Sequence, residues 1–234
     1  MAELNGSTIL VVGATGGLGR EIARALSSAG ATLVLSARDL ADLAALGVPG
    51  AIVPADLTDP AAISRLVEEA TSVTGGLDGV VVAAGVVAFG PVTALSPATI
   101  ERLFAVNTVA PMLLLQAAHT ALAASAAAGR SPFLLTLSGV VSESPTANLA
   151  AYSASKAAIA AFGAAAGREL RRAGIRIIDA RPGHTETALS THPIAGETPR
   201  LPRGLDPADV AARIVRAILT DERDLPSTAF TPGA

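Results

Sequence analysis

The chain contains no cysteine, and this absence excludes three kinds of site. Without thiols there is no disulfide framework, no zinc–thiolate centre and no cysteine nucleophile, and the composition fits a reducing compartment such as the cytoplasm. The three histidines, His119, His184 and His192, lie far apart, without HxxxH or HExxH spacing. The sequence therefore predicts a cytoplasmic protein without a metal site.

The chain also has a small net charge and no apolar stretch of membrane-spanning length. The net charge is −3, and only 16% of the residues are charged, so the chain has no general attraction to nucleic acid or anionic lipid. The longest apolar stretch, from Val80 to Val92, falls short of the about 20 residues that a membrane-spanning helix needs. The start, MAELNGS, lacks the basic segment of a signal peptide. We expect neither nucleic acid nor a membrane as a partner.

Hydrophobic residues, in contrast, make up 50% of the 234 residues, enough for one sizeable core. No linker divides the sequence, so we predict a single domain over residues 1–234. Short apolar runs rich in β-branched residues lie at 8–12, 32–36, 51–55, 79–84, 132–138 and 175–180.

Because these runs are continuously apolar rather than alternating, they indicate strands that are covered on both faces, as in a parallel sheet. Helix-compatible segments separate them, and Asp59-Pro60 and Asp206-Pro207 are typical helix starts. The pattern predicts an α/β Rossmann-type, doubly wound parallel sheet of six or seven strands, with a short edge strand near 224–230. Ligands of such sheets bind at the carboxyl ends of the strands.

A glycine-rich turn follows the first predicted strand and precedes a helix that we expect to begin near Arg20. Glycines in this context permit a tight turn and leave helix N-terminal amides free to hold a pyrophosphate. An ordinary strand–helix turn is the alternative, and no Lys-Ser/Thr follows that would indicate a P-loop. The turn consists of Gly13, Ala14, Thr15, Gly16, Gly17, Leu18 and Gly19.

The only tyrosine, Tyr152, stands four residues before Lys156, so both side chains share one helix face. An ammonium close to the phenol lowers the pKa of the phenol, which would let the tyrosine exchange a proton near neutral pH. Ser138 ends the strand before this helix, and we expect its hydroxyl to point into the ligand crevice. A surface Tyr/Lys pair is the alternative.

Asn107 lies in a helical segment that begins near Pro97, four residues before Pro111. Because proline has no N–H, the Asn107 carbonyl is released from the helix ladder and can hold a water molecule. A simple helix kink is the other interpretation, and both can hold together.

These features together resemble the compact single-domain branch of the short-chain dehydrogenase/reductase family, over about residues 6–220. GATGGLG is similar to the family's TGxxxGxG, and YSASK to its YxxxK. The resemblance implies a tetrad: Tyr152 as general acid/base, Lys156 as the residue that lowers its pKa and binds the nicotinamide ribose, Ser138 on the substrate oxygen, and Asn107 on a proton-relay water.

The resemblance also implies further cofactor contacts. In addition to the glycine turn, these are Asp56 and Leu57 at the adenine, Ala84 and Gly85 after the fourth strand, and Pro182, Gly183, Thr185 and Thr187 at the carboxamide. Val12 and the segment VAAG at 82–85 depart from the family's threonine and NNAG, and we interpret this as altered packing. The glycine spacing also satisfies the longer epimerase/dehydratase branch, whose extra substrate domain the chain lacks.

The second strand ends in Ser36-Ala37-Arg38-Asp39. NAD enzymes of this fold place an acid here for the ribose 2′-hydroxyl, whereas an arginine accommodates a 2′-phosphate. Ala37 stands at the acid position with Arg38 beside it, so the sequence favours NADP(H) over NAD(H); we expect Asp39 to cap the next helix. A solvated helix-start arginine is the alternative for Arg38.

We predict an apolar substrate pocket, which is lined by Val86, Val87, Phe89, Val140, Val141 and the segment 189–205. A loop-rich lid segment at about 184–205 covers this pocket and is expected to stay mobile until ligand binds. This lining favours a small or lipophilic carbonyl or alcohol substrate.

The Ala-rich segments 157–166 and 112–128 are apolar around most of their circumference, which predicts a homodimer or homotetramer.

Two other functions stay open. A non-catalytic dinucleotide-binding sensor or regulatory protein can have the same fold. A methyltransferase that uses S-adenosylmethionine is less favoured, because such an enzyme is expected to have an acidic residue at the end of the second strand, where this chain has Ala37.

Overall fold

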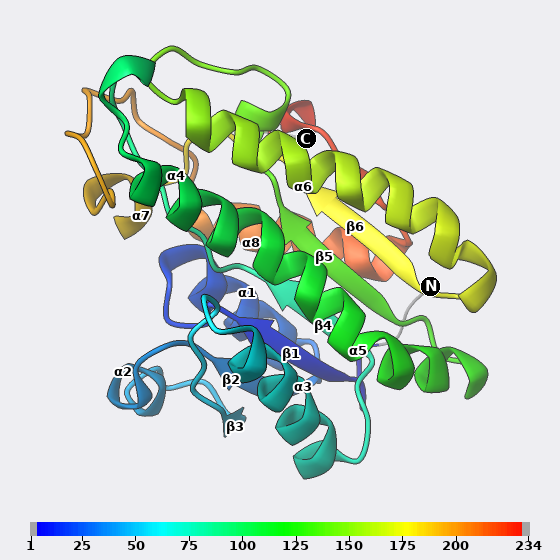
Figure 1. Cartoon of the computed structure of the whole chain (residues 1–234). Coiled ribbons are helices and arrows are strands. Elements are labelled where there is room, and N and C mark those ends of the chain that lie inside the picture. Colours follow the sequence, from blue (N-terminus) through cyan, green and yellow to red (C-terminus); the bar gives the residue numbers. More distant parts are fainter. Residues whose placement is uncertain (1–3, 231–234) are drawn as a thin grey trace.

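The computed structural model describes residues 4–230, and a seven-stranded parallel sheet forms its centre (Figure 1). The strands follow the order β3-β2-β1-β4-β5-β6-β7. Their bounds are β1 Thr8–Val12, β2 Thr32–Ser36, β3 Ala51–Ile52, β4 Gly79–Val82, β5 Phe133–Leu137, β6 Arg176–Ala180 and β7 Asp224–Leu225. The order reverses between β1 and β4, and this is the place where sheets of this kind bind ligands.

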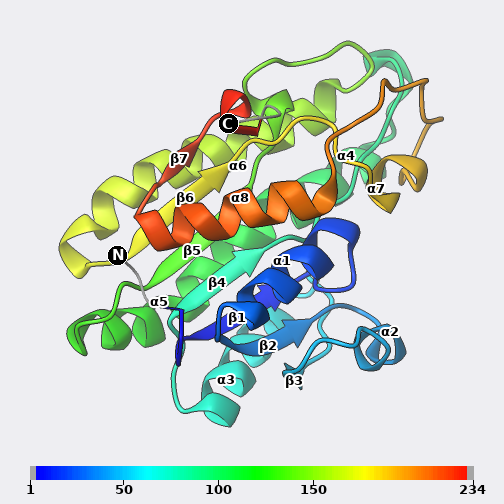
Figure 2. The same cartoon turned by 180° about the vertical axis from the view of Figure 1, so that it is seen from behind.

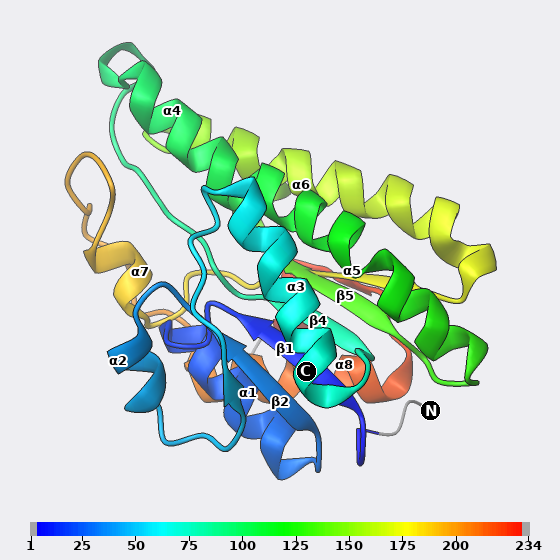
Figure 3. The ribbon, with the colours of Figure 1, turned by 60° about the horizontal axis from the view of Figure 1, so that its bottom comes forward.

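Helices cover both faces of the sheet. On one face lie α1 and α8, which Figure 2 shows in front of the strands, and on the other lie α3, α5 and α6, which Figure 3 shows as one layer. The bounds are α1 Gly17–Ser28, α2 Leu40–Ala44, α3 Pro60–Thr74, α4 Pro97–Phe104, α5 Ala110–Ala127, α6 Ala150–Glu169, α7 Ala188–Thr191 and α8 Pro207–Thr220. The predicted single-domain, doubly wound α/β fold is confirmed.

The double covering explains why the strands are apolar throughout. In β1, Ile9 and Val11 pack against α1 and α8, whereas Leu10 and Val12 pack against α3 and α5. Successive side chains of a strand point to opposite faces, so a strand that is buried on both sides needs apolar residues at every position.

Asp39, Asp59 and Asp206 each begin a helix by accepting hydrogen bonds from first-turn amides. Asp59 Oδ1 accepts from Ala61 N at 2.9 Å, and Asp206 Oδ1 accepts from Ala208 N at 2.7 Å. Such caps satisfy amides that have no partner inside the helix. The predicted helix starts at Asp59 and Asp206, and the capping role of Asp39, are therefore confirmed.

Several predicted boundaries differ, three of them in ways that matter for the fold. The strand predicted at 51–55 is β3, which ends at Ile52, although Val53 N and Ala55 N still donate hydrogen bonds to the Leu35 and Ala37 carbonyls. The edge strand predicted near 224–230 is only β7, after which Ser227–Phe230 forms a 3₁₀ turn. The first helix begins at Gly17 instead of near Arg20.

The helical run from Pro97 to Ala127 is interrupted by a π-helical turn at Ala105–Val109, which contains Asn107. By length and composition, this run is the one segment of residues 4–230 that is apolar enough to cross a membrane. It packs against α3 and α6, so the same composition also serves a core helix.

Candidate active site

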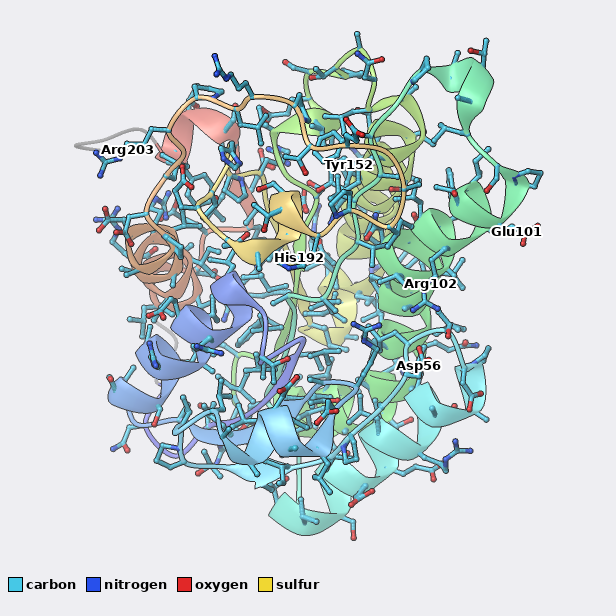
Figure 4. The ribbon with its side chains drawn as sticks, turned by 90° about the vertical axis from the view of Figure 1, so that its left-hand side faces the viewer. Asp56, Glu101, Arg102, Tyr152, His192 and Arg203 are labelled. Atoms are coloured by element: carbon cyan, nitrogen blue, oxygen red, sulfur yellow. The ribbon has the colours of Figure 1, made fainter. Side chains whose placement is uncertain are left out.

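A cavity of about 540 Å³ opens at the carboxyl ends of the strands, between the sheet and α7 (Figure 4). The predicted site residues that line it are Gly13, Gly16, Gly17, Leu18, Arg38, Asp56, Leu57, Ala84, Gly85, Tyr152, Lys156, Pro182, Gly183, Thr185 and Thr187. Residues from six different segments of the sequence thus meet in one place. Four predicted residues, Thr15, Gly19, Asn107 and Ser138, do not line the cavity.

The glycine turn brings the N-terminus of α1 to the cavity wall. Gly13 has φ +83°, and a Cβ there would lie 2.5 Å from Ala84 N, so only glycine fits between β1 and the loop after β4. Gly19 packs on Gly13, where a Cβ would lie 2.1 Å from the Gly13 carbonyl oxygen. Gly16 is the N-cap of α1, and no side chain caps this helix end. The first-turn amides therefore face the cavity as an anion site.

Tyr152 and Lys156 lie on the same face of α6, at the floor of the cavity. The Lys156 Nζ lies 5.9 Å from the centroid of the Tyr152 ring and donates a 2.6 Å hydrogen bond to the Leu137 carbonyl. Burial lowers the pKa of Lys156 to about 8, an effect that the charge of Asp179 partly offsets. Burial also raises the pKa of Tyr152 to about 12, so the lowered tyrosine pKa that we expected is wrong for this geometry.

Asn107 lies directly behind the cavity wall. Its side chain accepts from Val86 N at 2.9 Å and donates to the Val86 carbonyl at 2.9 Å and to Ser155 Oγ at 3.1 Å. A Cβ on Gly85 would lie 3.4 Å from Asn107 Oδ1 and 3.6 Å from Lys156 Nζ, so these groups are neighbours. The amide side chain thus joins α6 to the loop after β4.

Ser138 does not point into the crevice, and that expectation is corrected. The residue is fully buried, and its hydroxyl donates a 2.6 Å hydrogen bond to Asp179 Oδ2 on β6. Thr136 Oγ1 donates to the other oxygen of the same carboxylate at 2.9 Å. Side chains two residues apart share a sheet face, so Ser138 follows Thr136 onto the sheet, beside Asp179. Gly139, the next residue, lines the cavity instead.

Arg181 balances the buried carboxylate and connects it to the end of the described chain. Its guanidinium donates to Asp179 Oδ2 at 3.0 Å, to Glu143 Oε1 at 2.5 Å and to Asp224 Oδ1 at 2.5 Å. Glu143 in turn accepts from Ser227 Oγ at 2.5 Å. The loop that begins at Gly139 is therefore held through Glu143 by Arg181, which follows β6, and by Ser227, which follows β7.

At the far end of the cavity lie Arg38, Asp56 and Arg102. Thr58 donates to Asp56 Oδ1 from its backbone N–H at 2.9 Å and from its hydroxyl at 2.8 Å. These two hydrogen bonds lower the pKa of Asp56, and both arginines add a smaller lowering. Our sequence reasoning missed Arg102, and its position five residues before Asn107 on the same helical run was the available signal.

The remaining wall is apolar, and the predicted residues Val86, Val87, Phe89, Val140, Val141 and Leu189 all line it. The segment 184–205 forms a roof, because Ile194 N donates to the Val87 carbonyl at 2.8 Å and Phe89 N donates to the Ala195 carbonyl at 2.9 Å. Figure 4 shows His192 on this roof, facing the cavity. The half of the cavity beside Tyr152 therefore offers a substrate mainly apolar contacts.

Comparison with known proteins agrees with this architecture. The family model for short chain dehydrogenases matches residues 7–197. The ketoacyl reductase HetN of Nostoc is 30% identical over 93% of this chain and 77% of its own length. A metagenomic short-chain oxidoreductase, solved in complex with NADP, is 31% identical with a TM-score of 0.80, over 96% of this chain and 98% of that one. The 3-ketoacyl-(acyl-carrier-protein) reductase of Brucella melitensis, solved with NADH, shares the fold, with a TM-score of 0.86 at 24% identity over 97% and 100% of the two chains.

The fold and the cavity define a dinucleotide-binding α/β protein with a tyrosine and a lysine at its floor. The chain belongs to the short-chain dehydrogenase/reductase family, whose members are oxidoreductases that use nicotinamide cofactors.

Proposed function

We propose that the protein is an NADP(H)-dependent oxidoreductase that interconverts a carbonyl compound and a secondary alcohol, with Tyr152 as general acid/base. The observation that supports this most directly is that the open amides of α1 and the Tyr152/Lys156 pair share one cavity. An anion site and a half-buried proton donor at opposite parts of one pocket suit a dinucleotide whose reactive ring lies beside a small substrate.

The residues around the cavity fit the cofactor. The amides of Gly17 and Leu18 at the α1 N-terminus hold the pyrophosphate, and the absence of an acid at Ala37 leaves Arg38 free for a 2′-phosphate. A Cβ on Gly17 would lie 2.8 Å from Thr187, so Thr187 stands next to the anion site, where the resemblance places the carboxamide. When bound, NADP(H) supplies or accepts the hydride.

The pKa values suit carbonyl reduction near neutral pH. With a pKa of about 12, the Tyr152 hydroxyl keeps its proton at pH 7 and can donate it as the substrate oxygen gains negative charge. Lys156, with a pKa of about 8, is mostly cationic at pH 7 and favours the phenolate that remains. The backbone carbonyl of Asn107, released by Pro111, is available for the water through which the proton is replaced. Ser138 takes no direct part and supports the cavity wall through Asp179.

We propose a lipophilic ketone, aldehyde or secondary alcohol as substrate. The cavity wall near Tyr152 is formed by Val86, Phe89, Val140 and Val141, which give no charge to pair with a polar substrate. The name of the ketoacyl reductase among the relatives agrees with a carbonyl on an aliphatic chain.

The test is Tyr152→Phe, assayed with NADPH and a panel of aliphatic ketones and aldehydes. Turnover should fall by about 100-fold or more, because the proton donor is lost, while the dissociation constant for NADPH stays within about twofold. Near wild-type turnover of the variant on a genuine substrate would refute the role of Tyr152.

The buried hydroxyl of Ser138 favours a second candidate, a non-catalytic dinucleotide sensor, because the cavity then offers one reactive hydroxyl fewer than an enzyme of this family is expected to have. The same panel separates the two functions. A wild-type protein that binds NADPH but turns over no carbonyl or alcohol would support the sensor.

We also propose a homodimer or homotetramer that forms through α5 and α6. Ala161, Ala164 and Ala165 on α6 are exposed, and Val109 at the start of the α5 run is 45% exposed. Small side chains allow two helices to approach closely, and a twofold contact would remove this apolar surface from water. The cytoplasmic location and the absence of a membrane partner stay predictions of the sequence.

A further inference from the structure

Two arginines at the far end of the cavity have no partner within residues 4–230. Arg38 follows β2 and Arg102 lies on α4; both line the cavity, and neither forms a hydrogen bond or an ion pair with a described residue. The positive charges of both arginines lower the pKa of Asp56, which lies close to them. Arg181 and Arg213, in contrast, are engaged in ion pairs outside the cavity wall. Two guanidinium groups without a protein partner at one end of a cavity indicate a ligand that presents a separate binding group to each of them.

The surroundings of Arg102 differ from those of Arg38. Arg102 lies one helical turn before Val106, so both side chains face the cavity, and Figure 4 shows Arg102 beside Asp56 while the neighbouring Glu101 points away. Val106 is 6% exposed and Leu57 is 9% exposed, and together with Ala84 they form apolar walls. Arg102 therefore stands at the mouth of an apolar recess, next to an ionised carboxylate.

These surroundings favour a flat, neutral ring over a phosphate. A phosphate beside Asp56 would meet a carboxylate whose pKa is already lowered, and the two negative charges would repel each other. A planar base can enter between apolar side chains, offer its amino group to Asp56 and present its face to a guanidinium, which is planar and weakly hydrated.

We infer that Arg102 binds the adenine base of the dinucleotide by stacking on it, whereas Arg38 binds the 2′-phosphate. This inference rests on the proposed function, because it assigns the second cation of the cofactor site. It adds a cofactor-binding residue on α4 and divides the recognition of adenosine between two arginines that approach from different elements of the fold.

The experiment measures the binding of cofactor fragments by titration calorimetry. Arg102→Ala should weaken 2′,5′-ADP and 5′-AMP by the same factor, about 2- to 30-fold, and leave nicotinamide mononucleotide unchanged. Arg38→Ala should weaken 2′,5′-ADP alone. Arg65→Ala is the matched control, because Arg65 is an exposed arginine of α3 outside the cavity wall, and it should change no constant.

Arg102→Lys, which keeps the charge but not the planar group, should restore little of the lost affinity. Full restoration by lysine, a selective loss of 2′,5′-ADP in Arg102→Ala, or no loss at all would each overturn the stacking role. A wild-type protein that binds none of the fragments and no NADPH would instead refute the proposed function itself, so the two failures are distinguishable.

Discussion

Replacing Ser138 by alanine separates a catalytic hydroxyl from a structural one. In the structure, this hydroxyl donates a 2.6 Å hydrogen bond to the buried carboxylate of Asp179 and contributes no atom to the cavity wall. A buried hydrogen bond to a charged acceptor is worth about 1.5–3 kcal/mol. Asp179 keeps Thr136 at 2.9 Å and Arg181 at 3.0 Å in the variant, so its charge stays paired and the loss should not exceed this range.

For a domain of this size, that loss corresponds to a melting temperature lower by about 3–12 °C. The turnover number with NADPH and an active carbonyl substrate should stay within about threefold of the wild type, because no hydroxyl leaves the cavity. Thermal unfolding followed by circular dichroism and steady-state assays of the same preparation measure both quantities.

Ser153→Ala is the matched control. Its hydroxyl is buried on the same helix as Tyr152 and has no hydrogen-bond partner among the described residues, so its removal should leave the melting temperature unchanged or slightly higher. If Ser138→Ala lost 100-fold or more in turnover at an unchanged melting temperature, the hydroxyl would act in the cavity and our interpretation of its hydrogen bond would be wrong.

Three other predictions test the lysine, the phosphate site and the assembly. The pKa of Lys156 is about 8 in the folded protein and 10.5 in the unfolded chain, so between these pH values the unfolded chain holds one more proton at Lys156. The free energy of unfolding of the wild type should therefore rise by about 3 kcal/mol over this pH range relative to that of Lys156→Met. If urea titrations gave the same pH dependence for both proteins, this prediction would be wrong. Arg38→Ala should weaken NADPH by about 10- to 100-fold and NADH little, whereas equal affinity of the wild type for both cofactors would refute the 2′-phosphate site. Light scattering should give a multiple of 23.2 kDa, with dissociation in Ala161→Glu; a wild-type monomer at micromolar concentration would refute the assembly.

The fold class, and most of the residues that line the cavity, follow from local patterns in the sequence. Continuously apolar runs can be buried only between two layers of helices, and the glycine turn after the first of them places helix amides at a strand end. The spacing from Tyr152 to Lys156 required a shared helix face, and Asp39, Asp59 and Asp206 marked helix starts through local hydrogen bonds. All these features depend on neighbours within a few residues, which a sequence shows directly.

The directions of side chains from distant segments depend on how the whole chain packs. Ser138 turns to the sheet because Asp179, which is 41 residues away, lies on the adjacent strand and attracts its proton. Arg102 joins Arg38 at one end of the cavity only because the run through α4 brings it next to Asp56. The direction of the Tyr152 pKa depends on burial, and neither burial nor long-range pairing can be derived from local spacing, because both arise when the whole chain packs.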